Sequence, residues 1–104
     1  MAGVGRPTVR AMTEFGPDDE IDRGHMVPLY RQLAEIIKAR IERGDWQPGR
    51  AIPSVAQLMA EYELGRDTVR HAVRALEEEG VVVTVPGRGT YVKPPPTTGR
   101  RGRR

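Results

Sequence analysis

The residues best suited to chemistry gather in one stretch of the sequence, residues 65–76. Three arginines, Arg66, Arg70 and Arg74, fall there within about two and a half helical turns. Arginine can form two parallel hydrogen bonds with the O6 and N7 atoms of guanine, and a helix N-terminus suits a phosphate group. The same pattern also fits an ordinary amphipathic helix with a solvated charged face. The stretch alone leaves both interpretations open.

These side chains need a helix with one buried face, and the sequence supplies it. Apolar residues recur at the i, i+3, i+4, i+7 spacing: Val69, Ala72, Val73 and Leu76. The opposite face carries the arginines together with Thr68 and His71, and three glutamates follow at the far end. The pattern predicts a helix over residues 66–79 with its basic residues sorted onto one face.

The sequence lacks the residues that metal, catalytic and cofactor sites require. The chain has no cysteine and only two isolated histidines, so neither disulfides nor a metal site are expected. No Ser/His/Asp arrangement, paired carboxylate or glycine-rich phosphate loop appears, and we therefore expect neither an enzyme nor a cofactor. His71, beside arginines, is interpreted as a nucleic-acid contact rather than a catalytic base. Without an apolar run of about 20 residues or a signal sequence, the protein is predicted to be cytoplasmic and not to bind a membrane.

Composition divides the 104 residues, which carry a net charge of +3, into three parts. Residues 1–25 hold three Arg and five acids among Gly and Pro, and are predicted to be a disordered arm. Residues 26–93 hold ten basic and nine acidic residues, and their apolar patterning predicts one small domain. Residues 94–104 hold four Arg and no acid, and are predicted to be a disordered Pro/Arg-rich tail able to contact phosphates.

The first predicted element is a helix over residues 28–43. Pro28 suits the first helical position, and Gly44 suits the residue just past the end. Between them runs an apolar stripe made of Leu29, Leu33, Ile36, Ile37 and Ile41.

The loop after this helix contains a turn and a short extended piece. Pro48 and Gly49 suit the central positions of a type II turn, and Ile52 must be extended because a proline follows it. Trp46, the single tryptophan, is predicted to fill the core rather than to stack on a ligand.

A second helix begins with a capping box. Ser54 is followed three residues later by Gln57, and the helical pattern ends near Tyr62. The corner Glu63-Leu64-Gly65 then leads into the arginine-bearing helix. A short capped helix, a turn with glycine and a basic second helix in series are typical of a helix-turn-helix.

A hairpin is predicted after the arginine-bearing helix. Residues 81–85 are almost entirely valine, which indicates a strand, and residues 90–92 form its return. The turn carries Arg88 between Gly87 and Gly89, so its backbone can approach a phosphate or the floor of a minor groove. After a recognition helix this arrangement is typical of the wing of a winged helix. A plain solvated turn is the alternative.

Between residues 27 and 92 the sequence resembles the DNA-binding domain of GntR-type bacterial transcription regulators. The matching segments keep the family's order and spacing: Pro28-Leu29-Tyr30-x-Gln32-Leu33, Ile41-x-x-Gly44, Pro48-Gly49, Pro53-Ser54, Arg66-Asp67-Thr68-Val69-Arg70, Ala72-Val73-x-x-Leu76, Gly80 and Gly87-Arg88-Gly89-Thr90-Tyr91-Val92. The resemblance implies an α+β winged helix-turn-helix in the order helix, strand, helix, helix, strand, strand. It also implies that Arg66, Thr68 and Arg70 meet the operator, with the Gly87 backbone and Arg88 at the wing.

The sequence departs from the family at three places. Ala56 stands where the family usually has a basic residue, and Gly65 where it usually has Ser or Thr. The residues after Lys93 are too few to form the effector-binding and dimerisation domain that the family usually has. We therefore expect no small-molecule effector site, and a monomer or weak dimer in solution, with pairing on DNA left open.

The sequence as a whole predicts a sequence-specific regulator of transcription that binds double-stranded DNA at the nucleoid. Helix 66–79 would enter the major groove, and the wing, residues 81–92, would contact the backbone or minor groove. The alternative is a winged-helix adaptor for protein partners that binds DNA only weakly and without sequence preference. The candidate DNA-binding residues are Ser54, Gly65, Arg66, Asp67, Thr68, Arg70, His71, Arg74, Gly87, Arg88 and Gly89.

Overall fold

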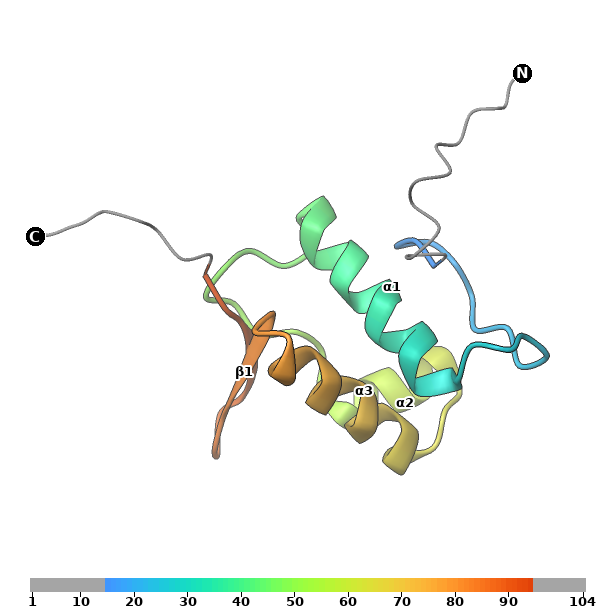
Figure 1. The fold of residues 1–104 in the computed structure, drawn as a ribbon. Helices are drawn as coiled ribbons and strands as arrows, with labels where there is room; N and C mark the ends of the chain where they lie inside the picture. Colours follow the sequence, from blue (N-terminus) through green and yellow to red (C-terminus); the bar gives the residue numbers. More distant parts are fainter. Residues whose placement is uncertain (1–14, 95–104) are drawn as a thin grey trace, which may run out of the picture.

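The computed structural model describes residues 15–94, and within them it contains three helices followed by a two-stranded antiparallel sheet. The elements are α1 (Leu29–Arg43), α2 (Val55–Tyr62), α3 (Arg66–Glu78), β1 (Val82–Val85) and β2 (Gly89–Val92). In Figure 1, α1 lies over α2 and α3, and the β1–β2 hairpin stands beyond the C-terminal end of α3. The winged helix-turn-helix architecture predicted from the sequence is confirmed.

The predicted ends of α1 are right to within one residue. Pro28 is the N-cap rather than the first helical residue, so the helix begins at Leu29. At the other end Gly44 takes the left-handed conformation, with φ of 99°, and its N–H donates to the carbonyls of Arg40 and Ile41. A residue with a Cβ would be strained in this conformation, which explains why glycine ends the helix.

The core lies where α3 packs against α1 and α2 and where the hairpin joins α3. Its buried apolar residues include Leu33, Ile37, Ile52, Leu58, Val69, Ala72, Leu76, Val82 and Val92. Each large aliphatic side chain buried here contributes about 1.5–3 kcal/mol to folding. Trp46 is not the core plug predicted: it is only half-buried at the edge of this cluster, where the Arg40 guanidinium lies 4.4 Å from its ring centre.

The predicted strand between α1 and α2 is reduced to one β-bridge, Ala51 to Tyr91. Three hydrogen bonds hold residues 49–52 beside β2: Gly49 N–H to Val92 O at 2.8 Å, Val92 N–H to Arg50 O at 2.8 Å, and Ile52 N–H to Thr90 O at 2.9 Å. A longer strand cannot form because a turn precedes the piece and Pro53, which has no N–H, follows it. The predicted turn is present, with Gly49 at φ 85° and Arg50 N–H donating to Gln47 O.

Residues 15–25, predicted to be disordered, instead pack against the domain. Phe15 is buried and meets the ring of His25 edge-on, with 5.3 Å between ring centres. Ile21 lies against the core cluster. Composition concealed these contacts because only two apolar residues, separated by acids and turns, provide the packing. Residues 1–14 of the predicted arm, and residues 95–104 of the predicted tail, lie outside the described residues.

Candidate nucleic-acid interface

The arginines of α3 form a row on the side of the helix that faces away from the core. Arg66, Arg70 and Arg74 are all exposed, and their spacing of four residues places them on one helical face. Asp67 is exposed in the first turn, whereas Thr68 is half-buried. The opposite face supplies the buried residues predicted for this helix, Val69, Ala72, Val73 and Leu76.

The α3 arginines differ from the basic residues near the C-terminal end of α1 in having no acidic partner. Within residues 15–94, neither these three arginines nor Arg88 forms an ion pair or a side-chain hydrogen bond. Three basic residues in the C-terminal half of α1 are paired: Lys38 lies 3.0 Å from Glu79, and Arg40 and Arg43 both bind Asp45. These two guanidiniums hold the pKa of the Asp45 carboxyl well below its usual range. The exposed face of α3 therefore keeps its positive charge available for an anion.

The two helices of the helix-turn-helix begin differently. The Ser54 hydroxyl accepts a hydrogen bond from Gln57 N–H at 3.1 Å, and the Gln57 side chain accepts from Ser54 N–H at 2.8 Å, so the predicted capping box is present. Gly65 begins α3 with no side-chain cap. The first N–H groups of α3 therefore point outward without a capping side chain, which suits a phosphate oxygen.

His71 is exposed on α3 but is held in place by α1. Its imidazole stacks on the ring of Tyr30, with ring centres 3.6 Å apart and an angle of 6° between the planes. The Arg31 guanidinium lies 5.8 Å from the centre of the same tyrosine ring. The sequence gave no signal that Tyr30 would fix the orientation of His71.

The wing ends in a tight turn that exposes Arg88. Arg88 N–H donates to Val85 O at 2.9 Å, and Gly87 has φ of 78°, so glycine is needed at this position. Gly89 follows with φ of 135°. The predicted turn and its exposed arginine are thus present, and the strands pair in register from Val82 with Val92 to Val85 with Gly89.

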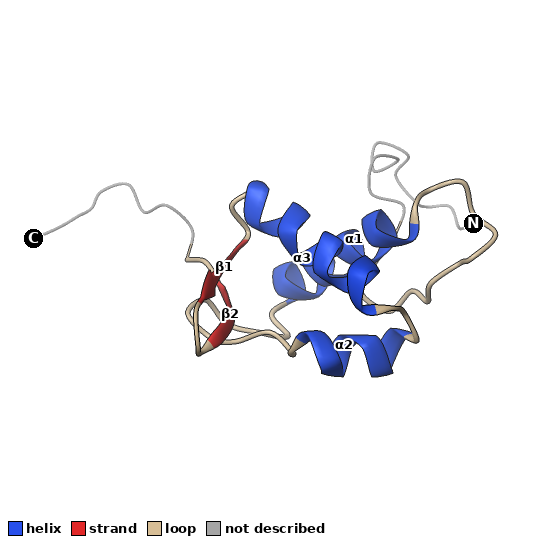
Figure 2. Cartoon of the chain, turned by 90° about the horizontal axis from the view of Figure 1, so that it is seen from below, coloured by secondary structure: helices blue, strands red, loops and turns tan. Residues whose placement is uncertain are grey.

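The base of the wing is joined to α3 by polar side chains. The Thr84 hydroxyl donates to the Glu77 carboxylate, and it also lies 3.3 Å from the Thr90 hydroxyl. The hairpin tip and α3 both lie along the lower edge of the molecule in Figure 1, with α1 above them. Seen from below, the strands continue beyond the ends of the helices (Figure 2). A long, narrow ligand could therefore meet both elements together.

Residues 15–94 contain neither a candidate metal site nor a membrane-spanning helix. No group of three or more His, Asp or Glu is placed to hold a metal ion. No helix in this part of the chain is long and apolar enough to cross a membrane.

Comparison with known proteins identifies the family of this fold. The family model described as "Bacterial regulatory proteins, gntR family" matches residues 29–92. The chain belongs to this family. This gntR-family chain is 46% identical over 70 residues to the mannosyl-D-glycerate transport/metabolism system repressor MngR of Escherichia coli, covering 67% of the chain and 29% of that repressor. It is 36% identical over 73 residues to the repressor YtrA of Bacillus subtilis, covering 70% and 56%.

Solved structures match the gntR-family chain over the same region. YtrA from Sulfolobus acidocaldarius, a GntR-family transcription factor, superposes with a TM-score of 0.66 at 33% identity, covering 72% of this chain and 79% of that one. The DNA-binding domain of AraR in complex with operator ORR3 gives a TM-score of 0.63 at 35% identity, covering 65% and 82%. The chain spans 27–31% of the length of the first curated relatives that it matches.

Proposed function

We propose that this chain binds double-stranded DNA at specific sequences and thereby regulates transcription. In this proposal α3 enters the major groove, and the wing contacts the backbone or the minor groove beside it. The observation that carries the proposal is the row of three exposed arginines on α3 with no acidic partner. Buried or neutralised arginines could not serve this role, because base and phosphate contacts need a free guanidinium fork.

The proposed contacts divide between bases and backbone. Arg66 and Arg70 read base edges, with Thr68 and His71 beside them, because their end of α3 lies next to the helix N-terminus that a groove admits first. Phosphates are bound by the uncapped N–H groups after Gly65 and by the backbone around Gly87, together with the side chains of Ser54, Arg74 and Arg88. Asp67 and Gly89 complete the proposed interface.

The comparisons support this function by analogy. MngR and YtrA of Bacillus subtilis are named as repressors, and the AraR structure contains an operator. A protein with the proposed function acts in the cytoplasm, on the bacterial nucleoid.

The first test is selection of bound duplexes from a random pool by the full chain, followed by two substitutions. We expect one sequence to be enriched, and Arg66→Ala and Arg70→Ala each to weaken its binding by about 1–3 kcal/mol. Arg43→Ala is the matched control, because it removes the same charge at the far end of α1. It should change the affinity much less than either α3 variant.

The second candidate function, a protein-interaction adaptor, predicts a different result. It is favoured by Ala56 and Gly65, the positions where side chains that could bind DNA are missing. An adaptor would enrich no sequence and would bind every duplex weakly, with all three variants alike. Equal affinity of wild type, Arg66→Ala and Arg70→Ala for the enriched duplex would refute the proposed role of α3.

A further inference from the structure

Residues 15–27, which we call the N-terminal strap, are tied to the domain by a fully buried side chain. Gln32 of α1 is 0% exposed, and its amide nitrogen donates to Asp22 O at 2.9 Å and to Val27 O at 2.8 Å. Its amide oxygen accepts from Asp22 N–H at 2.8 Å. A buried amide is stable only when its hydrogen bonds are made, so the strap and α1 hold each other in one arrangement.

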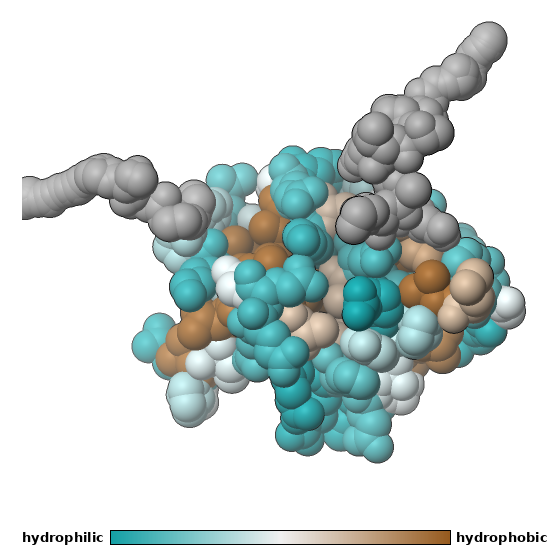
Figure 3. Space-filling view, in the orientation of Figure 1, coloured by the Kyte–Doolittle hydropathy of each residue, from teal (hydrophilic) through white to brown (hydrophobic). Residues whose placement is uncertain are grey.

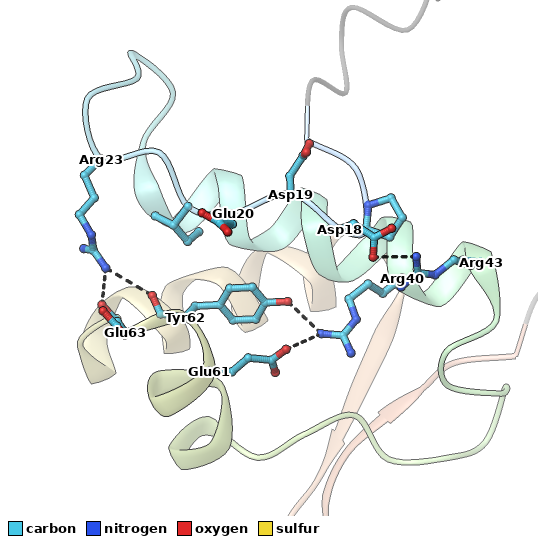
Figure 4. A pocket seen from close by; sticks show the side chains of 11 residues that line it. Asp18, Asp19, Glu20, Arg23, Arg40, Arg43, Glu61, Tyr62 and Glu63 are labelled. Carbon is cyan, nitrogen blue, oxygen red and sulfur yellow. Dashed lines mark hydrogen bonds and ion pairs between the residues drawn. The ribbon is translucent and has the colours of Figure 1, made fainter.

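A second tie runs from the strap to the end of α2. The Arg23 guanidinium donates to the carbonyl oxygens of Tyr62, at 3.3 Å, and Glu63, at 2.5 Å. Figure 4 shows Arg23 reaching down from the strap to these two residues. All three line a cleft of about 580 Å³. The last carbonyls of a helix have no partner within the helix and carry partial negative charge, so a guanidinium is favourable there.

The carbonyls that Arg23 binds belong to the turn of the helix-turn-helix. Glu63 has φ of 56°, the left-handed conformation, which is costly for a residue with a side chain. The buried Leu64 and then Gly65 complete the link to α3. Because so few residues join α2 to α3, the conformation at Glu63 sets the direction in which α3 leaves the turn.

We propose that Arg23 is a positioning residue: through the carbonyls of Tyr62 and Glu63 it holds the turn, and with it the orientation of α3 toward DNA. This inference rests on the proposed DNA-binding function. It assigns to the strap a part in sequence discrimination without contact between Arg23 and DNA.

The DNA test compares Arg23→Ala with Asp18→Ala in the full chain. Asp18 is also in the strap and binds Arg43 at 2.9 Å, away from the turn (Figure 4). The probes are the duplex enriched by wild type and a random duplex of equal length. We expect Arg23→Ala to reduce the preference for the enriched duplex by about two- to thirtyfold, the range for residues that act through others. Asp18→Ala should leave this preference unchanged.

The salt dependence of binding separates positioning from direct contact. If Arg23 positions the turn, the slope of log K against log salt is the same in wild type and Arg23→Ala, and Arg23→Lys restores part of the preference. If Arg23 touched a phosphate, the slope would fall by about one unit in Arg23→Ala, and the positioning role would be refuted.

Amide hydrogen exchange in the free protein tests the strap independently of DNA. Arg23→Ala should speed exchange at residues 64–69 while leaving residues 29–43 unchanged, and Asp18→Ala should do neither. Equal exchange at residues 64–69 in wild type and Arg23→Ala would overturn the inference, as would a uniform rise over the whole domain. If wild type enriches no sequence, the proposed function fails, but this comparison still decides whether Arg23 holds the turn.

Discussion

At the scale of single residues, the arginines of this domain serve two purposes according to their partners. Arg40 and Arg43 share the Asp45 carboxylate at 2.8–2.9 Å, and Arg40 also pairs with Glu61 and Arg43 with Asp18, so carboxylates neutralise the charge of both guanidiniums. The α3 arginines lie among exposed residues with no carboxylate in contact. A net charge of only +3 can therefore coexist with a strongly positive helix face.

At Gly65, the hydroxyl group of a serine should raise the stability of the domain. Its φ and ψ of −74° and 163° nearly equal the −69° and 167° of Ser54, which caps α2 with its hydroxyl. A Cβ at Gly65 would meet nothing within 4 Å. We therefore predict that Gly65→Ser caps α3 by accepting from Thr68 N–H, and that urea unfolding shows it to be more stable than wild type.

Gly65→Ala is the control for the Gly65→Ser prediction. Both substitutions restrict the unfolded chain, but only serine supplies a capping oxygen. The serine variant should exceed the alanine variant by about 1 kcal/mol in unfolding free energy. Equal stability of the two would mean that the hydroxyl does not cap α3.

At the scale of elements, the hydrogen bond between Thr84 and Glu77 should set the angle between the wing and α3. We predict that Glu77→Ala and Thr84→Val are coupled in a double-mutant cycle, by about 0.5–1.5 kcal/mol of unfolding free energy. Both should also weaken binding to the enriched duplex, because the wing is less well placed. Glu78→Ala, on the neighbouring exposed residue, is the control. If the effects of Glu77→Ala and Thr84→Val on the unfolding free energy were additive, the hydrogen bond between these residues would not join the wing to α3.

The elements that the sequence predicted well are those whose signals are local. The capping box at Ser54, the glycine at residue 44 and the run of valines from residue 81 each determine their own segment, and each is confirmed. The segments that the sequence predicted wrongly depend on residues that are distant in the chain. The piece before Pro53 is only a bridge because its hydrogen bonds come from β2, and Trp46 lies at the edge because Arg40 covers it.

The candidate interface shows the same division between local and distant signals. The exposed face of α3 and the Arg88 turn follow from periodicity and glycine placement, and both are in the structure. The stacking of Tyr30 on His71 and the tie from Arg23 to Glu63 join residues 41 and 40 positions apart. No local pattern encodes such pairs, so sequence reasoning could not find them.

At the scale of the whole molecule, the apolar side chains on the described surface bear on whether two copies associate. A stable dimer buries about 800 Å² on each partner, usually around an apolar centre. The large apolar side chains exposed within residues 15–94 are Met26, Val83 and Val85. Met26 precedes α1 and the valines lie on β1. In Figure 1 the segment before α1 and the strand β1 lie at opposite ends of the fold. In Figure 3 hydrophilic surface separates the apolar areas on the face shown.

We predict that the free chain sediments as a monomer at micromolar concentration and that DNA, not the protein surface, brings two copies together. On a duplex with two copies of the enriched sequence, one turn of the helix apart, two chains should bind on the same face. Sedimentation of the protein, free and with this duplex, measures both states, and a duplex with one copy is the control. A stable dimer without DNA would contradict the prediction.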